Sequence, residues 1–200
     1  MGFMDLMGSM GANTKNAIEI ARKSAEIAKE IVPGDGLREE IIRRCIIATG
    51  DVTIKDLIAF KGDPNIGVEV LKNGCKIIVD VKMLKVGLRR EAIAAIEFGG
   101  EGVETRVVDG IRKLANQIEG NLIGIGNAPS AAIELCKIAK KHPPAFIVAT
   151  PVGFVNAAKS KEMIRELDIP SIITVGTRGG STICAAIINC LIEHVAQRPH

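Results

Sequence analysis

The feature that most limits the fold of this chain is a regular alternation between short apolar runs, rich in β-branched residues, and segments of helical length. The runs that predict strands are 45–49, 75–80, 121–125, 145–150 and 171–175. The segments that predict helices are 13–32, 65–73, 89–98, 110–119, 129–141, 155–167 and 181–195. Strands that alternate with helices and lack a polar face are typical of a mostly parallel sheet with helices on both faces. The sequence therefore predicts a doubly wound α/β fold of the flavodoxin-like kind.

The length and composition predict one domain and exclude some classes of partner. Two hundred residues can bury a sizeable core, and no Pro/Gly-rich linker divides them. We expect a single domain over residues 1–200, with residues 1–12 as a flexible start. Only 2% of the residues are aromatic and the net charge is a mild +3, so the stacking platforms and basic surface of a nucleic-acid-binding protein are missing.

Membrane, disulfide and metal signals are also weak in the sequence. The longest stretch without a charged residue, 142–158, contains three prolines and is too short for a spanning helix. The five cysteines, Cys45, Cys75, Cys136, Cys184 and Cys190, form no C-x-x-C pair and are typical of reduced thiols. None of the three histidines pairs with a Cys, Asp or Glu at a spacing that we interpret as metal-ligating. We therefore expect a cytoplasmic protein with no metal site and no membrane partner.

The predicted fold places its ligand site at one edge of the sheet. Doubly wound sheets bind ligands in the crevice beyond the carboxyl ends of their strands. In this chain the loops at those positions are 49–51, 80–83, 126–129, 150–154 and 176–181. They are small, polar and rich in glycine. Arginines near strand ends or helix starts suggest an acidic ligand.

Two of these loops contain motifs that merit separate interpretation. In Gly124-Ile-Gly-Asn127-Ala-Pro129 the glycines allow a tight turn into a helix, which we expect Asn127 to cap; the same side chain could face a ligand. In Gly176-Thr-Arg178-Gly179-Gly-Ser181, free N–H groups and a guanidinium precede a helix and can hold an anionic oxygen. A carboxylate or phosphate site and a purely structural turn remain equally open for this second motif.

The last predicted helix, 181–195, is apolar on nearly every face. Such a helix must be buried either in the core or against a second subunit, so a homodimer is plausible. Asn189 within it needs a partner for its amide, because an unsatisfied buried amide costs about 1–3 kcal/mol.

Several separated motifs in this chain resemble one family. They are Ile18-Glu-Ile-Ala-Arg22-Lys-Ser24, Ala48-Thr49-Gly50-Asp51, Ile78-Val79-Asp80-Val81, Thr105-Arg106, Ile125-Gly126-Asn127-Ala128-Pro129, Pro151-Val152-Gly153-Phe154-Val155, Ser160-Lys161-Glu162 and Arg178-Gly179-Gly180-Ser181. In this order they resemble the precorrin-8X methylmutase family, also called precorrin isomerase, over about residues 17–192.

The resemblance implies a doubly wound α/β fold, a homodimer with sites at the subunit boundary, an anionic tetrapyrrole as ligand and no cofactor. In the family, a ring methyl group moves to a neighbouring carbon of the macrocycle, an isomerase reaction of cobalamin biosynthesis. By resemblance, the residues that would orient the acid side chains of the substrate are Ser24, Thr49, Arg106, Asn127, Gly153, Arg178, Gly179 and Ser181.

Three positions depart from the family pattern: Ile47, Val107, where the family usually has a small hydroxyl residue, and Thr177, where a second arginine is common. Ile47 stands where the family has a histidine that donates a proton or a hydrogen bond to the macrocycle, and isoleucine can do neither. A positioned general acid contributes about 10²–10⁴ in rate. Asp51 and Asp80 are the nearest candidates for a substitute proton carrier, because a carboxyl group buried beside a macrocycle can have a raised pKa.

Two functions follow from these observations. The first is a methylmutase-like isomerase acting on precorrin-8X or cobalt-precorrin-8, with Ile47 at the catalytic position. The second is a non-catalytic paralogue that holds a tetrapyrrole without rearranging it, which the missing histidine favours.

Overall fold

The computed structural model describes residues 14–100 and 103–197. The expected flexible start at 1–12 lies outside these residues. The α-helices are α2 (Lys15–Ile31), α3 (Leu37–Thr49), α4 (Asn65–Lys72), α5 (Lys82–Gly87), α6 (Arg106–Lys113), α7 (Ala115–Ile118), α8 (Pro129–Ile138), α9 (Ala157–Glu166) and α10 (Ser181–Gln197). The strands are β1 (Ile58–Lys61), β2 (Ile77–Val79), β3 (Ile93–Ala94), β4 (Leu122–Ile125), β5 (Phe146–Ala149) and β6 (Ser171–Thr174). Two short 3₁₀ helices, η1 (Val52–Asp56) and η2 (Ala95–Glu97), complete the described elements.

The six strands form one sheet in the order β1-β6-β5-β4-β2-β3. Strand β1 pairs with β6 in the antiparallel sense, and every other pair is parallel. If the five parallel strands are numbered along the chain, their order is 2-1-3-4-5, which is the flavodoxin-like order. The predicted fold class is therefore confirmed.

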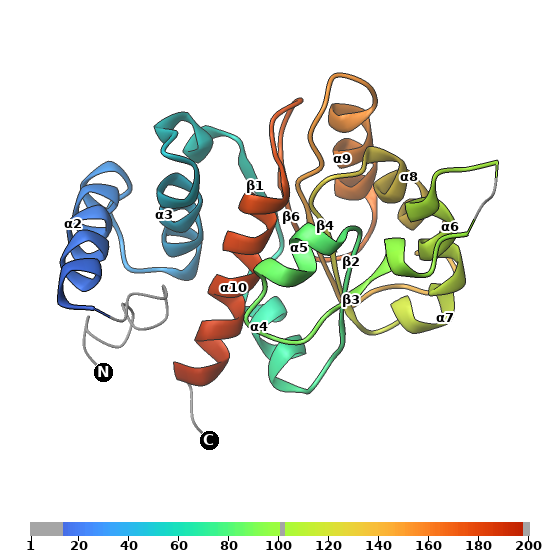
Figure 1. Ribbon diagram of the computed structural model, residues 1–200, viewed down its shortest axis with the longest axis horizontal. Coiled ribbons are helices and arrows are strands. Elements are labelled where there is room, and N and C mark those ends of the chain that lie inside the picture. The colour runs from blue at the N-terminus through green and yellow to red at the C-terminus, as the bar shows by residue number, and fades with distance from the viewer. Residues whose placement is uncertain (1–13, 101–102, 198–200) are drawn as a thin grey trace.

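The sheet is buried on both faces because its side chains alternate between two cores. Phe146 and Val148 of β5 belong to the core that contains α3, α4, α5 and α10. Ile147 and Ala149 belong to the core under α6, α7, α8 and α9. Figure 1 shows these two groups of helices on opposite sides of the strands. The alternation explains why each strand reads as a continuous apolar run.

The predicted strand at 45–49 is wrong, since these residues form the last turns of α3. The helix starts after Gly36, carries Glu39 and Glu40 in its first turn, and ends at Gly50, whose φ of 67° is left-handed. Ile41 and Cys45, one turn apart, are fully buried against α10. A short apolar run does not distinguish a strand from a buried helical turn, and here the packing on α10 decides.

Two other segments also differ from their predictions. The predicted helix at 89–98 is instead β3 followed by η2, and the edge strand β1 at 58–61 was not predicted. Both strands have four residues or fewer, too short for a clear period of two. The predicted helix at 110–119 begins earlier, at Arg106, and is divided into α6 and α7.

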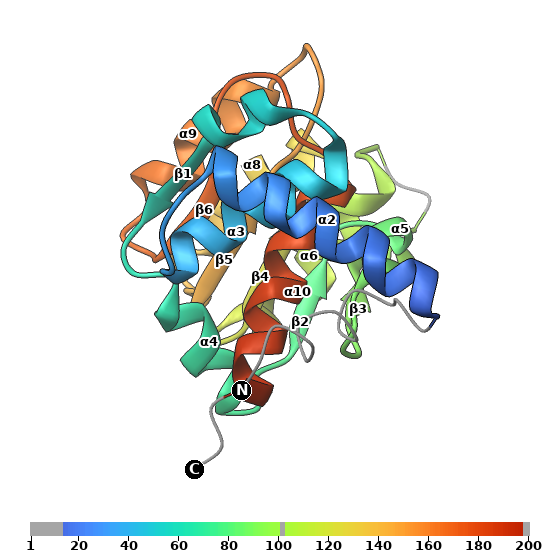
Figure 2. The same ribbon diagram turned by 90° about the vertical axis from the view of Figure 1, so that its left-hand side faces the viewer.

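Helices α2 and α3 form an arm on one side of the molecule. Helix α2 packs on α3, and α3 packs on α10, so α2 is the outermost layer (Figures 1 and 2). Thr14 caps the start of α2 by accepting a hydrogen bond from the Ala17 N–H at 3.2 Å. Helix α10 is buried within this chain by the sheet and by α3, α4 and α5. Within 14–100 and 103–197, no helix has both the length and the apolar character needed to cross a membrane.

Candidate functional site

The parallel part of the sheet changes its winding direction between β2 and β4. In flavodoxin-like folds the ligand crevice lies beyond the carboxyl ends of the strands at this point. Asp80 directly follows β2, and residues 126–128 directly follow β4. The structure therefore brings two of the predicted loops together at the expected position.

Asp80 joins these two loops with its carboxylate. Its Oδ1 accepts hydrogen bonds from the backbone N–H groups of Val81 (3.0 Å) and Gly126 (3.1 Å), and its Oδ2 accepts from Asn127 (2.7 Å) and Ala128 (2.8 Å). The side chain is fully buried. Burial raises the pKa of this carboxyl group, while the four donors act in the opposite direction. All four partners are donors, so the geometry gives Asp80 a loop-holding role and no route for passing a proton to a ligand.

Asn127 does not cap the following helix as predicted. The residue at the N-cap of α8 is Ala128, which makes no side-chain capping bond, and Pro129 occupies the first turn. The Asn127 backbone N–H is instead held by Asp80, and the residue is exposed. The carboxylate of Asp80, which follows a different strand, takes the place of the predicted Asn127 cap. The spacing of residues in the sequence could not indicate this long-range contact.

The loops after β5 and β6 are packed backbone against backbone. The Gly180 N–H donates to the Thr150 carbonyl at 2.7 Å, and the Gly153 N–H donates to the Thr177 carbonyl at 3.1 Å. A Cβ atom on Gly179 would lie 2.1 Å from the Thr150 carbonyl oxygen, so only glycine fits there. The glycine motif at 176–181 therefore has a structural function whatever it binds.

Lys161 of α9 is a buried cation that supports this loop. Its ammonium group is fully enclosed and donates to Thr174 Oγ1 (3.0 Å) and to the Arg178 carbonyl (2.7 Å). Burial lowers the pKa of Lys161 to about 8. Sequence reasoning gave this residue no function, although it lies on the buried face of its helix with Ala157 and Ile164. The spacing of Lys161 with Ala157 and Ile164 along one helix face was the sequence signal that could have indicated its burial.

Asp51 and Arg178 meet at the same edge although 127 residues separate them. Arg178 Nη1 donates to Asp51 Oδ2 (2.8 Å) and to Thr53 Oγ1 (2.7 Å). Its Nε and Nη2 have no hydrogen-bond partner within the described part of the chain. Hydrogen bonds from Thr53, and then the charge of Arg178, lower the pKa of Asp51. Asp51 is therefore ionised at neutral pH and is poorly suited to donate a proton, contrary to the raised pKa that we hypothesised.

Ile47 lies on α3 and lines a hollow of about 240 Å³ between α3 and α10. Arg44, Arg89 and Glu193 also line it, and the carboxylate of Glu193, which is nearly buried, pairs with both guanidinium groups. Asn189, on the same hollow, accepts from the Arg89 N–H (2.9 Å) and donates to the Gly87 carbonyl (2.8 Å). The expected partner for its amide is thus present.

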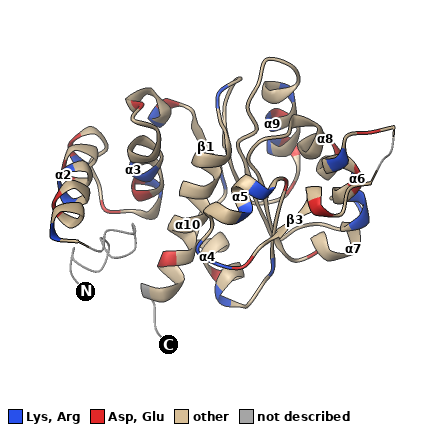
Figure 3. Ribbon diagram, viewed as in Figure 1, with Lys and Arg blue, Asp and Glu red and all other residues tan. Residues whose placement is uncertain are grey.

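Arg106 lines a second hollow of about 330 Å³ beyond the carboxyl end of β2. Its other lining residues are Val81, Lys82, Met83 and Ile96. Helix α5, which supplies Lys82 and Met83, carries basic residues where it crosses this edge (Figure 3). The hollow therefore combines apolar surface with two cationic side chains, as an anionic ligand with a large apolar body requires.

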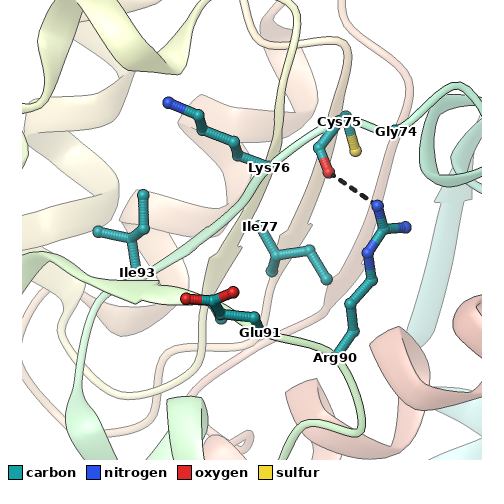
Figure 4. A pocket seen from close by; sticks show the side chains of 8 residues that line it. Gly74, Cys75, Lys76, Ile77, Arg90, Glu91 and Ile93 are labelled. Carbon is teal, nitrogen blue, oxygen red and sulfur yellow. Dashed lines mark hydrogen bonds between the residues drawn. The ribbon is translucent and has the colours of Figure 1, made fainter.

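A third cavity, of about 300 Å³, opens at the opposite edge of the sheet. Residues 74–77 and 90–93 line it at the amino ends of β2 and β3 (Figure 4). Arg90 donates there to the carbonyl groups of Leu71 (2.8 Å) and Cys75 (3.4 Å). Its guanidinium thus holds backbone, and the cavity lies away from the predicted loops.

Three of the other predicted site residues have constrained positions. Ser24 lies on the outer helix α2, where its hydroxyl donates to the Ile20 carbonyl at 3.0 Å, and the structure does not bring it to the sheet edge. Thr49 ends α3 and donates to the Cys45 carbonyl at 2.8 Å. Ser181 starts α10, but its Oγ is enclosed and has no hydrogen-bond partner among the described residues.

The fold and this edge define a doubly wound α/β protein with flavodoxin-like topology and a cationic, glycine-rich carboxyl edge. The profile of the family described as precorrin-8X methylmutase matches residues 19–194. The chain is 62% identical over 190 residues to the "Cobalamin biosynthesis protein CbiHC" of Archaeoglobus fulgidus, a match that covers 95% of this chain and 42% of that protein. It is 37% identical over 205 residues to the "Cobalt-precorrin-8 methylmutase" of Methanocaldococcus jannaschii, covering 92% of this chain and 97% of that one.

A solved structure agrees with these sequence matches. The precorrin-8X methyl mutase from Thermus thermophilus superposes with a TM-score of 0.81 at 29% identity, over 90% of this chain and 96% of the other. The chain belongs to the precorrin-8X methylmutase family, which is a family of isomerases. The family predicted from the motifs is confirmed. The chain spans less than half of the A. fulgidus protein but nearly all of the M. jannaschii one.

Proposed function

We propose that this protein is a methylmutase of cobalamin biosynthesis that moves a ring methyl group within precorrin-8X or cobalt-precorrin-8. Membership of the family supports this activity, and the names of its relatives favour an enzyme over a binding paralogue. The observation that carries the proposal is the Asp51–Arg178 contact. It holds the end of α3, the helix with the family's catalytic position, against the loops at the carboxyl edge of the sheet.

The cationic groups of this edge would bind the acid side chains of the macrocycle. Arg178 has two nitrogen atoms free for a carboxylate, and Arg106 and Lys82 line the neighbouring hollow. Bidentate arginine–carboxylate contacts provide both energy and orientation. Gly153, Gly179 and the backbone around Asn127 shape the edge, whereas Thr49, Ser24 and Ser181 need a ligand or a second subunit that reaches their positions.

We further propose that the enzyme acts as a homodimer in the cytoplasm. Helix α10 gives this no support, because its apolar faces are covered within the chain. Support comes from exposed apolar side chains elsewhere: Phe154 is 98% exposed and Val155 77% exposed on the loop after β5. Contiguous apolar groups of this kind mark interaction sites.

The proton donor is the open part of the mechanism. Ile47 offers no proton, Asp51 is held as a carboxylate, and Asp80 is enclosed by donors. A sigmatropic methyl shift moves a bond within the ring and needs no net proton, so protonation accelerates it without entering its balance. We therefore expect the natural chain to turn over its substrate more slowly than a variant with histidine in place of Ile47.

The test is to mix the purified protein with cobalt-precorrin-8 and with precorrin-8X and to follow the visible spectrum of the chromophore. Conversion supports the methylmutase, a bound but unchanged chromophore supports the binding paralogue, and no binding contradicts both. Ile47→His should raise the turnover about 10²-fold or more, because it restores a general acid beside the hollow. Ile47→Leu is the matched control, and equal rates for the two variants would exclude Ile47 as the catalytic position.

A further inference from the structure

Three different metal-binding side chains come together between α3 and α10, away from the edge loops. They are Glu40 of α3 with Cys190 and His194 of α10, and their ligand atoms all lie within 4.8 Å of one another. Cys190 is fully buried, and the side chains of Glu40 and His194 are 19% and 15% exposed. We propose that these residues form a binding site for a divalent transition-metal ion of the zinc type.

The local geometry brings one ligand atom of each residue within 4.8 Å of the other two. Cys190 and His194 are four residues apart and therefore share one face of α10. His194 Nδ1 lies 3.0 Å from the Cys190 carbonyl, which leaves Nε2 directed at Glu40 Oε2, 3.3 Å away. Arg44 holds the other carboxylate oxygen, Glu40 Oε1, at 3.1 Å.

These outer contacts are the kind that metal ligands make. A metal-bound histidine usually donates its second ring N–H to a carbonyl or carboxylate, and a metal-bound carboxylate is usually hydrogen-bonded at its other oxygen. Ligand atoms that surround zinc at about 2.0–2.3 Å are separated by about 3.3–3.8 Å from each other. Because the three ligand atoms lie up to 4.8 Å apart, the widest pair has to move closer by about 1.0–1.5 Å when an ion binds.

The donor set selects the class of ion. A thiolate, an imidazole and a carboxylate suit zinc-type ions, whereas magnesium and calcium prefer sites built from oxygen alone. Three protein ligands leave a fourth position for water or another ligand. On binding, the thiol of Cys190 releases its proton to solvent and the sulfur coordinates as the thiolate.

The surrounding charges do not oppose a cation. Arg44 and Arg89 are positive, but both are paired with Glu193, and Arg44 also with Glu40. The negative charges of Glu40 and Glu193 thus equal the positive charges of Arg44 and Arg89 before an ion binds. The ion would fasten α3 to α10 beside the hollow that Ile47 lines, and would so stabilise the position of that helix.

The proposed site differs from the expectation of no metal site drawn from the sequence. Cys190 and His194 are one helical turn apart in the sequence, but Glu40 is 150 positions away, so only the fold brings the three together.

The experiment uses the untagged full chain, freed of metal with a chelator. Zn²⁺ is titrated against a competing chromophoric chelator, and Co²⁺ is titrated while its visible absorption and its thiolate-to-cobalt charge-transfer band are recorded. We expect one ion per chain, tetrahedral cobalt bands and a raised melting temperature. His194→Gln and Glu40→Gln should weaken binding at least 10-fold, and Cys190→Ser should abolish the charge-transfer band.

The controls are His142→Gln and Cys136→Ser, which lie outside the cluster and should bind as the natural chain does. Circular dichroism establishes that each variant is folded, and the less buried His194 and Glu40 variants keep the test decisive if Cys190→Ser fails to fold. Binding that is absent, is not one to one, or is unchanged in His194→Gln would overturn the proposal. Because the experiment measures the amount of bound metal and not the turnover of substrate, its result is independent of the methylmutase function.

Discussion

The sheet edge and the α2–α3 arm build the proposed site in opposite ways. At the edge, buried polar groups hold the loops by hydrogen bonds, as with Asp80 and Lys161, and Gly179 packs against the Thr150 backbone. On the arm, α2 buries only Ala28, and Ile20 and Ile27 are each 59% exposed. The edge is thus a backbone scaffold that tolerates few changes, while the arm presents a helix surface.

This difference explains how residue 47, which we propose as the family's histidine position, can hold isoleucine without damage to the fold. Ile47 is half-buried on α3 and lines a hollow, so a change of side chain there alters chemistry more than packing. A change at Asp80 or Gly179 would instead disturb the loops themselves. We therefore expect substitutions at this proposed catalytic position on the arm to disturb the fold less than substitutions at the edge.

The largest expected effect comes from Asp80→Ala, which tests the rigidity of the edge. The substitution leaves four N–H donors, that of Gly126 buried and those of Val81, Asn127 and Ala128 part-buried, without their acceptor, and we expect the free energy of unfolding to fall by about 3–5 kcal/mol. Urea denaturation measures this change. Asp56→Ala, at an exposed aspartate on the arm side, is the control and should change stability by less than about 0.5 kcal/mol. A loss below about 1 kcal/mol for Asp80→Ala would mean that the edge is not held as we describe.

A smaller effect on the free energy of unfolding is expected from Lys161→Met, and this effect depends on pH. The pKa of Lys161 in the folded protein is about 8, below the ordinary value of 10.5 that applies to the unfolded chain. Between these values the unfolded chain binds more protons, so this lysine makes the folded state more stable as the pH rises, by up to about 1.4 kcal/mol per pH unit. Below pH 8 both states are protonated and its contribution is constant.

The measurement is the free energy of unfolding of the natural chain and of Lys161→Met at pH 7, 8, 9 and 10. We expect the difference between the two proteins to move in favour of the natural chain from pH 8 upward. The neutral amine retains two N–H donors for Thr174 and Arg178, so the loop contacts persist. A difference that is independent of pH would show that Lys161 is not desolvated in solution.

The smallest effect is expected from Ile20→Ser and Ile27→Ser on the arm. Both side chains are largely exposed, so each change should alter the free energy of unfolding by less than about 0.5 kcal/mol. Ile41→Ser on the neighbouring helix is the matched contrast, because Ile41 is fully buried and should cost about 3 kcal/mol or more. A large loss in either α2 variant would show that a second copy covers the arm, which would strengthen the proposed dimer.

Much of the fold was predictable because it depends on local patterns. Strands β2, β4, β5 and β6 are continuous apolar runs, and the helix that follows β4 begins at a clear signal, Pro129, whereas the short helix α5 after β2 was not predicted. The errors at 45–49 and 89–98 arose where apolar residues gave no distinct period, so that contacts with α10 and with β2 determined the outcome. The family motifs likewise identified the family from residues that are adjacent in the chain.

The site was predictable only in outline. The sequence placed the right loops at one edge. The contacts that hold these loops join distant residues: Asp80 with Ala128, Lys161 with Thr174, and Asp51 with Arg178, which are 48, 13 and 127 positions apart. By itself, the sequence determined the fold class, the family and the absence of a histidine at residue 47, since each is written in local order. Only the tertiary structure decided which polar groups are used up in building the edge and which remain for a ligand, because burial and hydrogen-bond partners exist only once distant segments have packed together.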